Sequence, residues 1–149
     1  MKSRTKARSL ALQVLYELDQ SNHPVGDVFS NRIVELPLDE PLSAFASSIV
    51  QGISPLRDEL DHVISKHAPE WPFDQVAIID RNILRIAVWE MVFDSATPIK
   101  VIINEAIELG KLYGSDATPR FINGVLGSLV QNQNGIKQYF ENCKHRQAE

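Results

Sequence analysis

The chain has 149 residues, of which 44% are hydrophobic and 23% are charged, and its 15 basic and 19 acidic side chains give a net charge of −4. This length is typical of one domain, here residues 1–149, and the composition is that of a globular protein with a buried core. No apolar run is long enough to cross a membrane, and the basic start leads into an amphipathic pattern, so we expect no secretion and a cytoplasmic protein. The single cysteine, Cys143, excludes an intrachain disulfide.

Positive charge is concentrated at the N-terminus, in a basic arm that we define as residues 1–8. Its four basic residues precede the first acidic residue, Glu17, and they are Lys2, Arg4, Lys6 and Arg8. The rest of the chain has 11 basic and 19 acidic residues. Such an arm can bind nucleic-acid phosphates, but it is also a common form of solvated helix end, and charge alone leaves both interpretations open.

An amphipathic first helix is indicated by the residues that begin within the arm. Apolar residues recur every three or four positions, and they are Ala7, Leu10, Ala11, Val14, Leu15 and Leu18. Arg4 and Arg8 lie on the opening turns, where the partial positive charge of a helix N-terminus disfavours each cation by about 0.3–1 kcal/mol. Acidic residues would suit helix stability better, so we interpret this conflict as the mark of a functional site.

The next third of the chain predicts two further helical regions. Residues 22–24 end the first helix, and the apolar spacing of residues 25–33 indicates a short second helix. Apolar residues then recur at helical spacing across residues 45–67, with an interruption at Ser54 and Pro55. Either Ser54 is the N-cap of a new helix that begins with Pro55, or one long helix kinks there.

Capping residues mark the helices of the second half. Asp80 is the expected N-cap of a helix over residues 81–93. Thr97 and Thr118 each precede a proline, which predicts a capping hydroxyl followed by proline in the first helical position. Gly114 is placed where a helix often ends in a left-handed residue.

Two glycines lie inside the helix that is expected after Thr118, namely Gly124 and Gly127. Glycine in a helix interior costs about 0.5–1 kcal/mol relative to alanine, so we expect another helix or a ligand to approach closely there. A short last helix is expected over residues 136–143. Six to eight helices with short connections predict an all-helical bundle.

Motifs for catalysis or metal binding are weak. No glycine-rich phosphate loop with a lysine is present, and His62 and His67 do not share a helical face. Glu105 and Glu108 are best explained as a solvated helix face in which Glu108 pairs with Lys111. We therefore expect no enzyme, no catalytic residue, no metal site and no cofactor.

Trp89 follows two arginines, Arg81 and Arg85, at four-residue spacing. An aromatic side chain flanked by arginines occurs in cation–π packing against the core and also at protein interfaces, where Trp and Arg are enriched. Both interpretations remain open from the sequence.

Three segments resemble the NusB family of transcription antitermination factors. They are DRNILRIAVWE at residues 80–90, PIKVIINEAIELGKLYG at 98–114 and FINGVL at 121–126. The first helix fits the same family pattern at Arg8, Ala11, Leu15 and Tyr16. The resemblance covers the whole chain, from the basic arm to the third segment.

The resemblance implies an all-α fold of about seven helices in two small packed bundles and a role in antitermination of ribosomal RNA transcription. It implies binding of boxA-type single-stranded RNA together with NusE, a small-subunit ribosomal protein, and indirect contact with the RNA polymerase elongation complex. Family members are monomers or homodimers. Two departures from the family pattern are Thr5, which interrupts the basic run, and Gly127, where relatives often have Asp near the RNA path.

Candidate binding residues follow from positions that match the family, from their location and from their chemistry. The candidates for RNA binding are Lys2, Arg4, Lys6, Arg8, Gln13, Arg120 and Asn123. Those for partner binding are Tyr16, Arg85, Trp89 and Glu90. We expect Glu90→Lys to weaken partner binding without unfolding the protein. Four phosphate contacts from the arm would give a log–log salt slope of only about −3 for single-stranded RNA, so the partner is expected to complete the binding surface.

Two other classes of function remain. One is a helical protein–protein adaptor without direct RNA binding, in which the basic arm is incidental. The other is an enzyme accessory, because NusB-like domains also occur fused to RNA cytosine methyltransferases. We expect no methyl transfer here, since this chain leaves no room for a cofactor-binding sheet.

Overall fold

The structure is a computed structural model that describes residues 2–69 and 72–148, with side chains described as far as residue 144. Helices are the only regular elements in this part of the chain. The α-helices are α1 (Ser3–Gln20), α2 (Val25–Glu35), α3 (Glu40–Ile53), α4 (Arg57–His67), α5 (Ile78–Phe93), α6 (Ile99–Tyr113), α7 (Thr118–Gln131) and α8 (Gln133–Ala148). Two 3-10 helices, Ser54–Leu56 and Phe73–Gln75, join α3 to α4 and precede α5. The predicted all-helical fold is confirmed.

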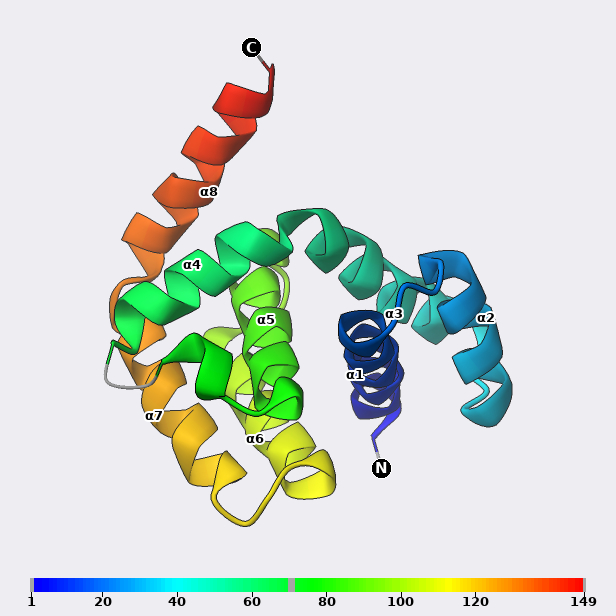
Figure 1. Ribbon diagram of the computed structural model, residues 1–149. Helices are drawn as coiled ribbons and strands as arrows, with labels where there is room; N and C mark the ends of the chain where they lie inside the picture. Colours follow the sequence, from blue (N-terminus) through cyan, green and yellow to red (C-terminus); the bar gives the residue numbers. More distant parts are fainter. Residues whose placement is uncertain (1, 70–71, 149) are drawn as a thin grey trace.

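The helices form two groups that share one continuous core (Figure 1). Helices α1, α2 and α3 make up the first group, and α4 to α8 make up the second. Helix α5 is central to the second group, since it packs against α4, α6, α7 and α8. Helix α1 joins the groups, because it packs against α2 and α3 on one side and against α5 and α6 on the other.

Helix α1 is buried on more sides than its predicted apolar stripe requires. The residues of the stripe from Ala7 to Leu15 are buried as expected, and Leu12 is buried as well. Three polar residues of the same helix, Thr5, Arg8 and Ser9, are also buried. A helix that contacts neighbours on several sides has no broad polar face, so its polar residues must find partners inside the protein.

The junction at Ser54 and Pro55 is a short 3-10 helix between two α-helices. Ser54 is the C-cap of α3, where its N–H donates to Val50 O, and it has helical backbone angles, so the alternative in which it is an N-cap is wrong. Helix α4 begins two residues after Pro55, at Arg57, and the chain changes direction between α3 and α4 (Figure 1). This arrangement is closest to the kinked alternative.

The predicted caps of the later helices are wrong because the same side chains make other contacts, across 38 residues for Asp80 and Thr118 and within one turn for Thr97. Helix α5 begins at Ile78, so Asp80 lies in its first turn and accepts a hydrogen bond from Thr118 Oγ1 at 3.0 Å. Thr118 is itself the first residue of α7, and its hydroxyl accepts from the Ser115 N–H. The hydroxyl of Thr97 donates to Asp94 Oδ2 at 2.7 Å, before α6 begins.

The expected roles of the glycines also change. Gly114 has a φ of −91°, so it is not the left-handed residue that was predicted, but a Cβ there would collide with the side chain of Thr118. Gly124 and Gly127 have no neighbour within 4 Å of an added Cβ, so the close approach expected at both is absent. Gly52 on α3 is the site of close approach, because the indole of Trp89 occupies the space of its missing side chain.

The last helix is longer than predicted and docks at its start. Ile136, Phe140 and Cys143 of α8 are buried, and α8 packs against α5 and α7. Its C-terminal end extends away from the rest of the molecule (Figure 1). None of the helices in the described residues combines the length and the apolar character needed to cross a membrane.

Candidate nucleic-acid interface

The start of α1 presents three cations to solvent. Lys2, Arg4 and Lys6 are exposed, and the first turn of α1 contains no acidic residue and no side-chain cap. Lys2 and Lys6 are four positions apart and share a face of the helix, whereas Arg4 lies roughly on the opposite side. The three cations therefore surround the end of α1 and can reach a strand that passes across it.

Arg8 lies one turn deeper and is only 1% exposed. Its Nε donates to Glu90 Oε2 at 2.9 Å and its Nη2 donates to Glu90 Oε1 at 2.6 Å, which is a two-pronged ion pair between α1 and α5. Glu105 of α6 lies 3.5 Å from Nη1 and accepts a hydrogen bond from Thr5 Oγ1 at 2.7 Å. The guanidinium of Arg8 therefore joins three helices.

The charge of Arg8 is retained in this buried position. Burial lowers the pKa of the Arg8 guanidinium, but the hydrogen bonds and negative charge of Glu90, together with Glu105, raise it more, and the net pKa lies above its ordinary value. The carboxylates of Glu90 and Glu105 thus compensate the positive charge of Arg8 near the helix N-terminus. For Arg8 the conflict with the helix dipole therefore has a structural explanation.

The burial of Arg8 and Glu90 corrects two sequence-based expectations. Arg8 cannot contact RNA directly from this position, because its guanidinium is enclosed. Glu90, at 1% exposed, is not a surface contact for a partner, and Glu90→Lys would place a second cation against Arg8. That substitution is therefore expected to destabilise the fold, contrary to the expectation from sequence.

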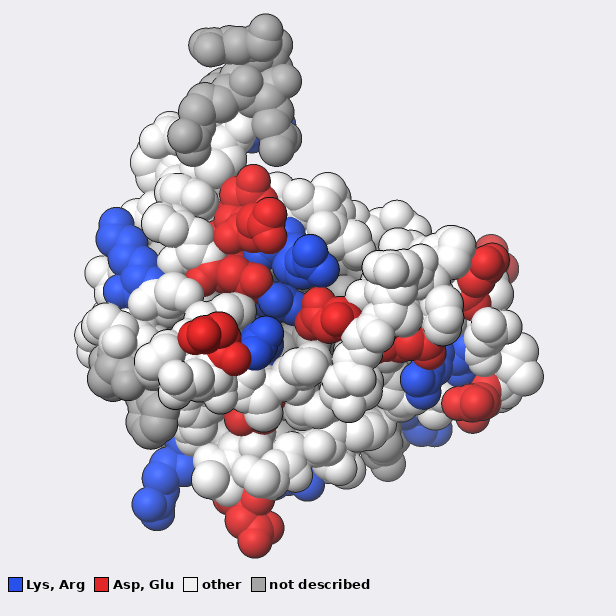
Figure 2. Space-filling model, viewed as in Figure 1, with Lys and Arg blue, Asp and Glu red and all other residues white. Residues whose placement is uncertain are grey.

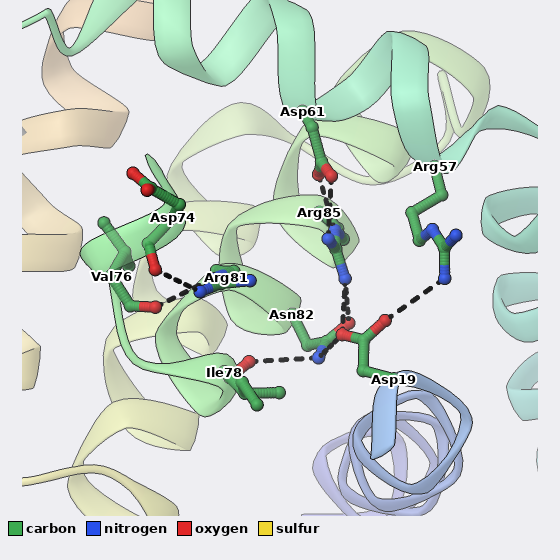
Figure 3. Close-up of polar contacts among 9 residues, drawn as sticks. All are labelled: Asp19, Arg57, Asp61, Asp74, Val76, Ile78, Arg81, Asn82 and Arg85. Atoms are coloured by element: carbon green, nitrogen blue, oxygen red, sulfur yellow. Dashed lines mark hydrogen bonds and ion pairs between the residues drawn. The ribbon is translucent and has the colours of Figure 1, made fainter. Parts of the chain in front are cut away.

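Arg85 is the second enclosed arginine, and it links α1, α4 and α5 (Figure 3). Its Nη1 donates to Asp19 Oδ2 at 2.7 Å, and its Nε and Nη2 donate to the two carboxylate oxygens of Asp61 at 2.6 and 2.8 Å. Asn82 Oδ1 accepts a further hydrogen bond at 3.0 Å. Exposed by only 3%, Arg85 is an internal link between helices and is not available as the predicted partner contact.

The carboxylates of Asp61 and Asp19 also stabilise the charged form of Arg85. Burial lowers the pKa of the Arg85 guanidinium, and the hydrogen bonds and charges of Asp61 and Asp19 outweigh that effect, so the net pKa is raised. Arg57 on α4 lies 3.5 Å from Asp19 Oδ1 at the exposed edge of the same network. Asp19 and Asp61, which the sequence analysis did not single out, are therefore structural.

Gln13 and Tyr16 continue along α1 from the cationic end, and both are half-buried. The Gln13 side-chain amide donates to Tyr113 Oη of α6 at 3.3 Å. Between α1 and α6 lies a hollow of about 380 Å³ lined by Lys2, Thr5, Asn104, Glu105 and Glu108. Lys2 is thus next to a polar, partly acidic groove.

Trp89 packs within the protein while keeping part of its surface accessible. Its indole covers Gly52, and its ring centroid lies 6.1 Å from that of Phe93, which is 47% exposed. Phe93 in turn contacts Phe140 of α8 edge to face, at 5.6 Å. Of the two interpretations left open by the sequence, these contacts favour packing.

Arg120 and Asn123 are exposed on α7, away from the other candidates. Helix α7 packs against α4, α5, α6 and α8, and α6 lies between it and the start of α1 in Figure 1. Arg120 borders a cavity of about 360 Å³ with His67, Phe121 and Gly124. The predicted RNA-binding residues therefore occupy two separate surfaces.

Phe45 of α3 was placed only in an apolar stripe by the sequence analysis, but it contacts the basic arm. Its ring centroid lies 4.0 Å from the guanidinium carbon of Arg4 and 5.2 Å from that of Arg8. Aromatic–arginine pairs separated by more than 35 residues leave no local signal in a sequence.

Basic residues do not form a broad positive surface on the face shown in Figure 2, where blue and red side chains are interspersed. Within the described residues, no three His, Cys, Asp or Glu side chains are grouped so that they could hold a metal ion. The exposed cations at the start of α1 are therefore a local feature of a mixed surface.

The fold and this site define a class of protein: an all-helical protein whose first helix, α1, is enclosed by other helices and begins with exposed cations. The family model described as the NusB family matches residues 5–131. The chain belongs to the NusB family, as its sequence motifs indicated. The transcription antitermination protein NusB of Chloroflexus aggregans is 41% identical over 129 residues, covering 85% of this chain and 86% of that protein. The transcription antitermination protein NusB of Bacillus subtilis is 42% identical over 130 residues, covering 87% of this chain and 95% of that protein.

Solved structures are similar over nearly the whole chain. NusB from T. maritima has a TM-score of 0.78 at 26% identity and covers 94% of this chain and 98% of that one. A chain from the crystal structure of antitermination factors NusB and NusE in complex with dsRNA has a TM-score of 0.77 at 26% identity, covering 93% and 98%. A chain from the crystal structure of a plectonemic RNA supercoil has a TM-score of 0.81 at 27% identity, covering 88% and 96%.

Proposed function

We propose that this protein is a transcription antitermination factor that binds RNA through the start of α1 and assembles with the ribosomal protein NusE. The observation that carries the proposal is the exposure of Lys2, Arg4 and Lys6 on a helix end without acidic residues. Membership of the NusB family supports it, as does the similarity to a NusB–NusE–RNA complex.

Electrostatics favours RNA phosphates as the ligands of these cations. Each cation is unfavourable beside the partly positive N-terminus of α1, and an approaching phosphate would compensate both charges. With Arg8 enclosed, the arm supplies at most three phosphate contacts, which correspond to a log–log salt slope of about −2 for a single strand. Affinity from so few contacts is modest, so the protein partner contributes part of the binding surface.

The RNA that we propose is the boxA-type single strand of nascent ribosomal RNA. Half-buried Gln13 follows Lys6 along α1 and offers its side-chain amide to an unpaired base. The NusB–NusE complex that contains a similar chain holds double-stranded RNA. The test must therefore compare single-stranded with double-stranded RNA.

For NusE, we propose Tyr16 as the principal contact among the predicted partner residues. Tyr16 is half-buried, whereas Arg85 and Glu90 are enclosed and Trp89 packs on Gly52. A partner seated at Tyr16 would lie about 15 Å along α1 from RNA held by Lys6. Contact with the RNA polymerase elongation complex would then run through the partner.

Binding of fluorescently labelled RNA, followed by anisotropy with and without NusE, tests the proposal. We expect single-stranded boxA-type RNA to bind more tightly than its duplex or a scrambled strand. The triple variant Lys2→Ala, Arg4→Ala, Lys6→Ala should bind it at least tenfold more weakly. A matched triple variant, Lys66→Ala, Lys137→Ala, Lys144→Ala, removes the same charge from α4 and α8 and should bind as wild type.

The adaptor alternative predicts a different pattern in the same experiment. If NusE binds wild type and the arm variant equally, and neither protein changes the anisotropy of any RNA, the protein is a protein–protein adaptor. Equal weakening by both triple variants would show nonspecific attraction and would remove the role of the arm.

A further inference from the structure

Phe45 connects the enclosed arginine of α1 to an exposed one. Its ring centroid lies 5.2 Å from the guanidinium carbon of Arg8 and 4.0 Å from that of Arg4. Arg4 and Arg8 are one helical turn apart on α1, and Phe45 comes from the neighbouring helix α3. The exposed guanidinium of Arg4 therefore rests on an aromatic ring and does not extend freely into water.

The base of this arrangement is rigid. Arg8 is fixed by two hydrogen bonds to Glu90, and Phe45 is half-buried against the hydrophobic core. Helix α3, which carries Phe45, begins with an N-cap in which Asp39 accepts from the Leu42 N–H. The guanidinium carbon of Arg4 lies 4.0 Å from the centroid of this supported ring, and Arg4 as a residue is exposed to solvent.

We propose that Arg4 and Phe45 form a stacking platform for an unpaired base of the bound RNA. Every base has a π-face, and unpaired bases stack on guanidinium planes and aromatic side chains. Lys2 and Lys6 can only supply point charges to phosphates, whereas the planar Arg4 can accept a stacked base. The inference rests on the proposed function and adds a base contact on the α3 side of the arm.

Conservative variants separate stacking from charge. Arg4→Lys keeps the positive charge but loses the plane, and Phe45→Leu keeps the apolar volume but loses the ring. Each should weaken binding of single-stranded RNA about fivefold or more, the cost of losing one base stack. The salt slope should remain that of wild type, because no charge has been removed. The matched control Lys66→Arg, a charge-conserving change on α4 outside the arm, should bind as wild type.

A double variant and a spectroscopic readout complete the test. If the two side chains form one platform, Arg4→Lys with Phe45→Leu should bind only as weakly as the weaker single variant. RNA carrying 2-aminopurine at successive positions should show quenching at one position with wild type, and the quenching should be lost with Arg4→Lys. Arg4 is exposed, so its variant remains informative even if Phe45→Leu lowers the melting temperature.

The outcomes distinguish this inference from the proposed function. Wild-type affinity and quenching for Arg4→Lys, together with weak binding by the triple alanine variant, would overturn the platform and leave the arm as a phosphate contact. Absence of RNA binding by wild type, with and without NusE, would overturn both.

Discussion

At the scale of residues, the two enclosed arginines share one arrangement, in which each guanidinium pairs with two carboxylates. Arg8 and Arg85 each bind carboxylates from other helices, Glu90 and Glu105 in one case and Asp19 and Asp61 in the other. An enclosed ion pair adds little net stability compared with apolar packing, but removal of one partner leaves a buried charge uncompensated. The pairs therefore fix how α1 is oriented against α5 more than they strengthen the fold.

The Arg8–Glu90 pair predicts strong coupling between substitutions. Arg8→Met or Glu90→Leu alone should lower the free energy of unfolding by about 3–5 kcal/mol, because each strands the opposite charge. The double variant should lose much less than the sum of the two. Urea denaturation of the four proteins measures this, and additive losses would mean that the pair is not coupled.

Gly52 and Gly124 make a matched pair of helical glycines. Gly52→Ala should destabilise the protein by about 1–3 kcal/mol, because the new methyl group displaces the indole of Trp89. Gly124→Ala should stabilise it by about 0.5–1 kcal/mol, since nothing lies within 4 Å of the added Cβ. Thermal unfolding compares the two, and equal effects would argue against the packing of Trp89 on α3.

The exposed cations of the arm could be found from sequence, but the enclosed ones could not. Lys2, Arg4 and Lys6 are evident from charge and from their place before a helix. Arg8 has the same local signature, and its partner Glu90 lies 82 residues further along the chain. Only tertiary packing distinguishes a cation that faces water from one that faces a carboxylate.

At the scale of elements, Glu17 joins the end of α1 to the connection that precedes α2 and to the last turn of α2. Its carboxylate shares a hydrogen bond with His23 Nδ1 at 3.1 Å and accepts one from Arg32 Nε at 3.0 Å. These interactions, the hydrogen bond with His23 first, hold the pKa of the Glu17 carboxyl below its ordinary value of 4.5. The contact depends on the charged form of the acid.

The lowered pKa of Glu17 predicts a pH-dependent contribution to stability. Because the folded state favours the ionised form, the contribution is complete above pH 4.5 and is lost as the pH falls through the lower folded value. Glu17→Gln should therefore have a lower urea midpoint than wild type at pH 7, and the difference should shrink as the pH falls below 4.5. A difference that persists unchanged in acid would contradict this assignment.

The helices were predictable from sequence to the extent that one face is apolar. The apolar spacing located the elements now seen as α1, α5, α6 and α7, whose buried stripes include Leu10, Ile83, Ile102 and Ile122. The helix starts were less predictable, because Asp80 and Thr118 bind each other across 38 residues. The start of α8 was missed since Gln133 to Gly135 carry no apolar signal.

At the scale of the whole molecule, α1 connects the fold to the proposed function. Its middle is enclosed by α2 and α3 of its own group and by α5 and α6 of the other, whereas its first residues have exposed cations. The enclosed part is held by Arg8 at one point and by Asp19 at another. The protein therefore presents a rigid cationic end on a body that is acidic in sum.

The central claim is that this cationic end binds RNA phosphates, and the salt dependence of RNA affinity tests it most directly. Binding constants for boxA-type RNA in the presence of NusE should be measured between about 50 and 200 mM salt for wild type and the triple variant Lys2→Ala, Arg4→Ala, Lys6→Ala. The account predicts that the log–log slope of the variant is smaller in magnitude by about 2, as three lost contacts require. Equal slopes and equal affinities for the two proteins would contradict it.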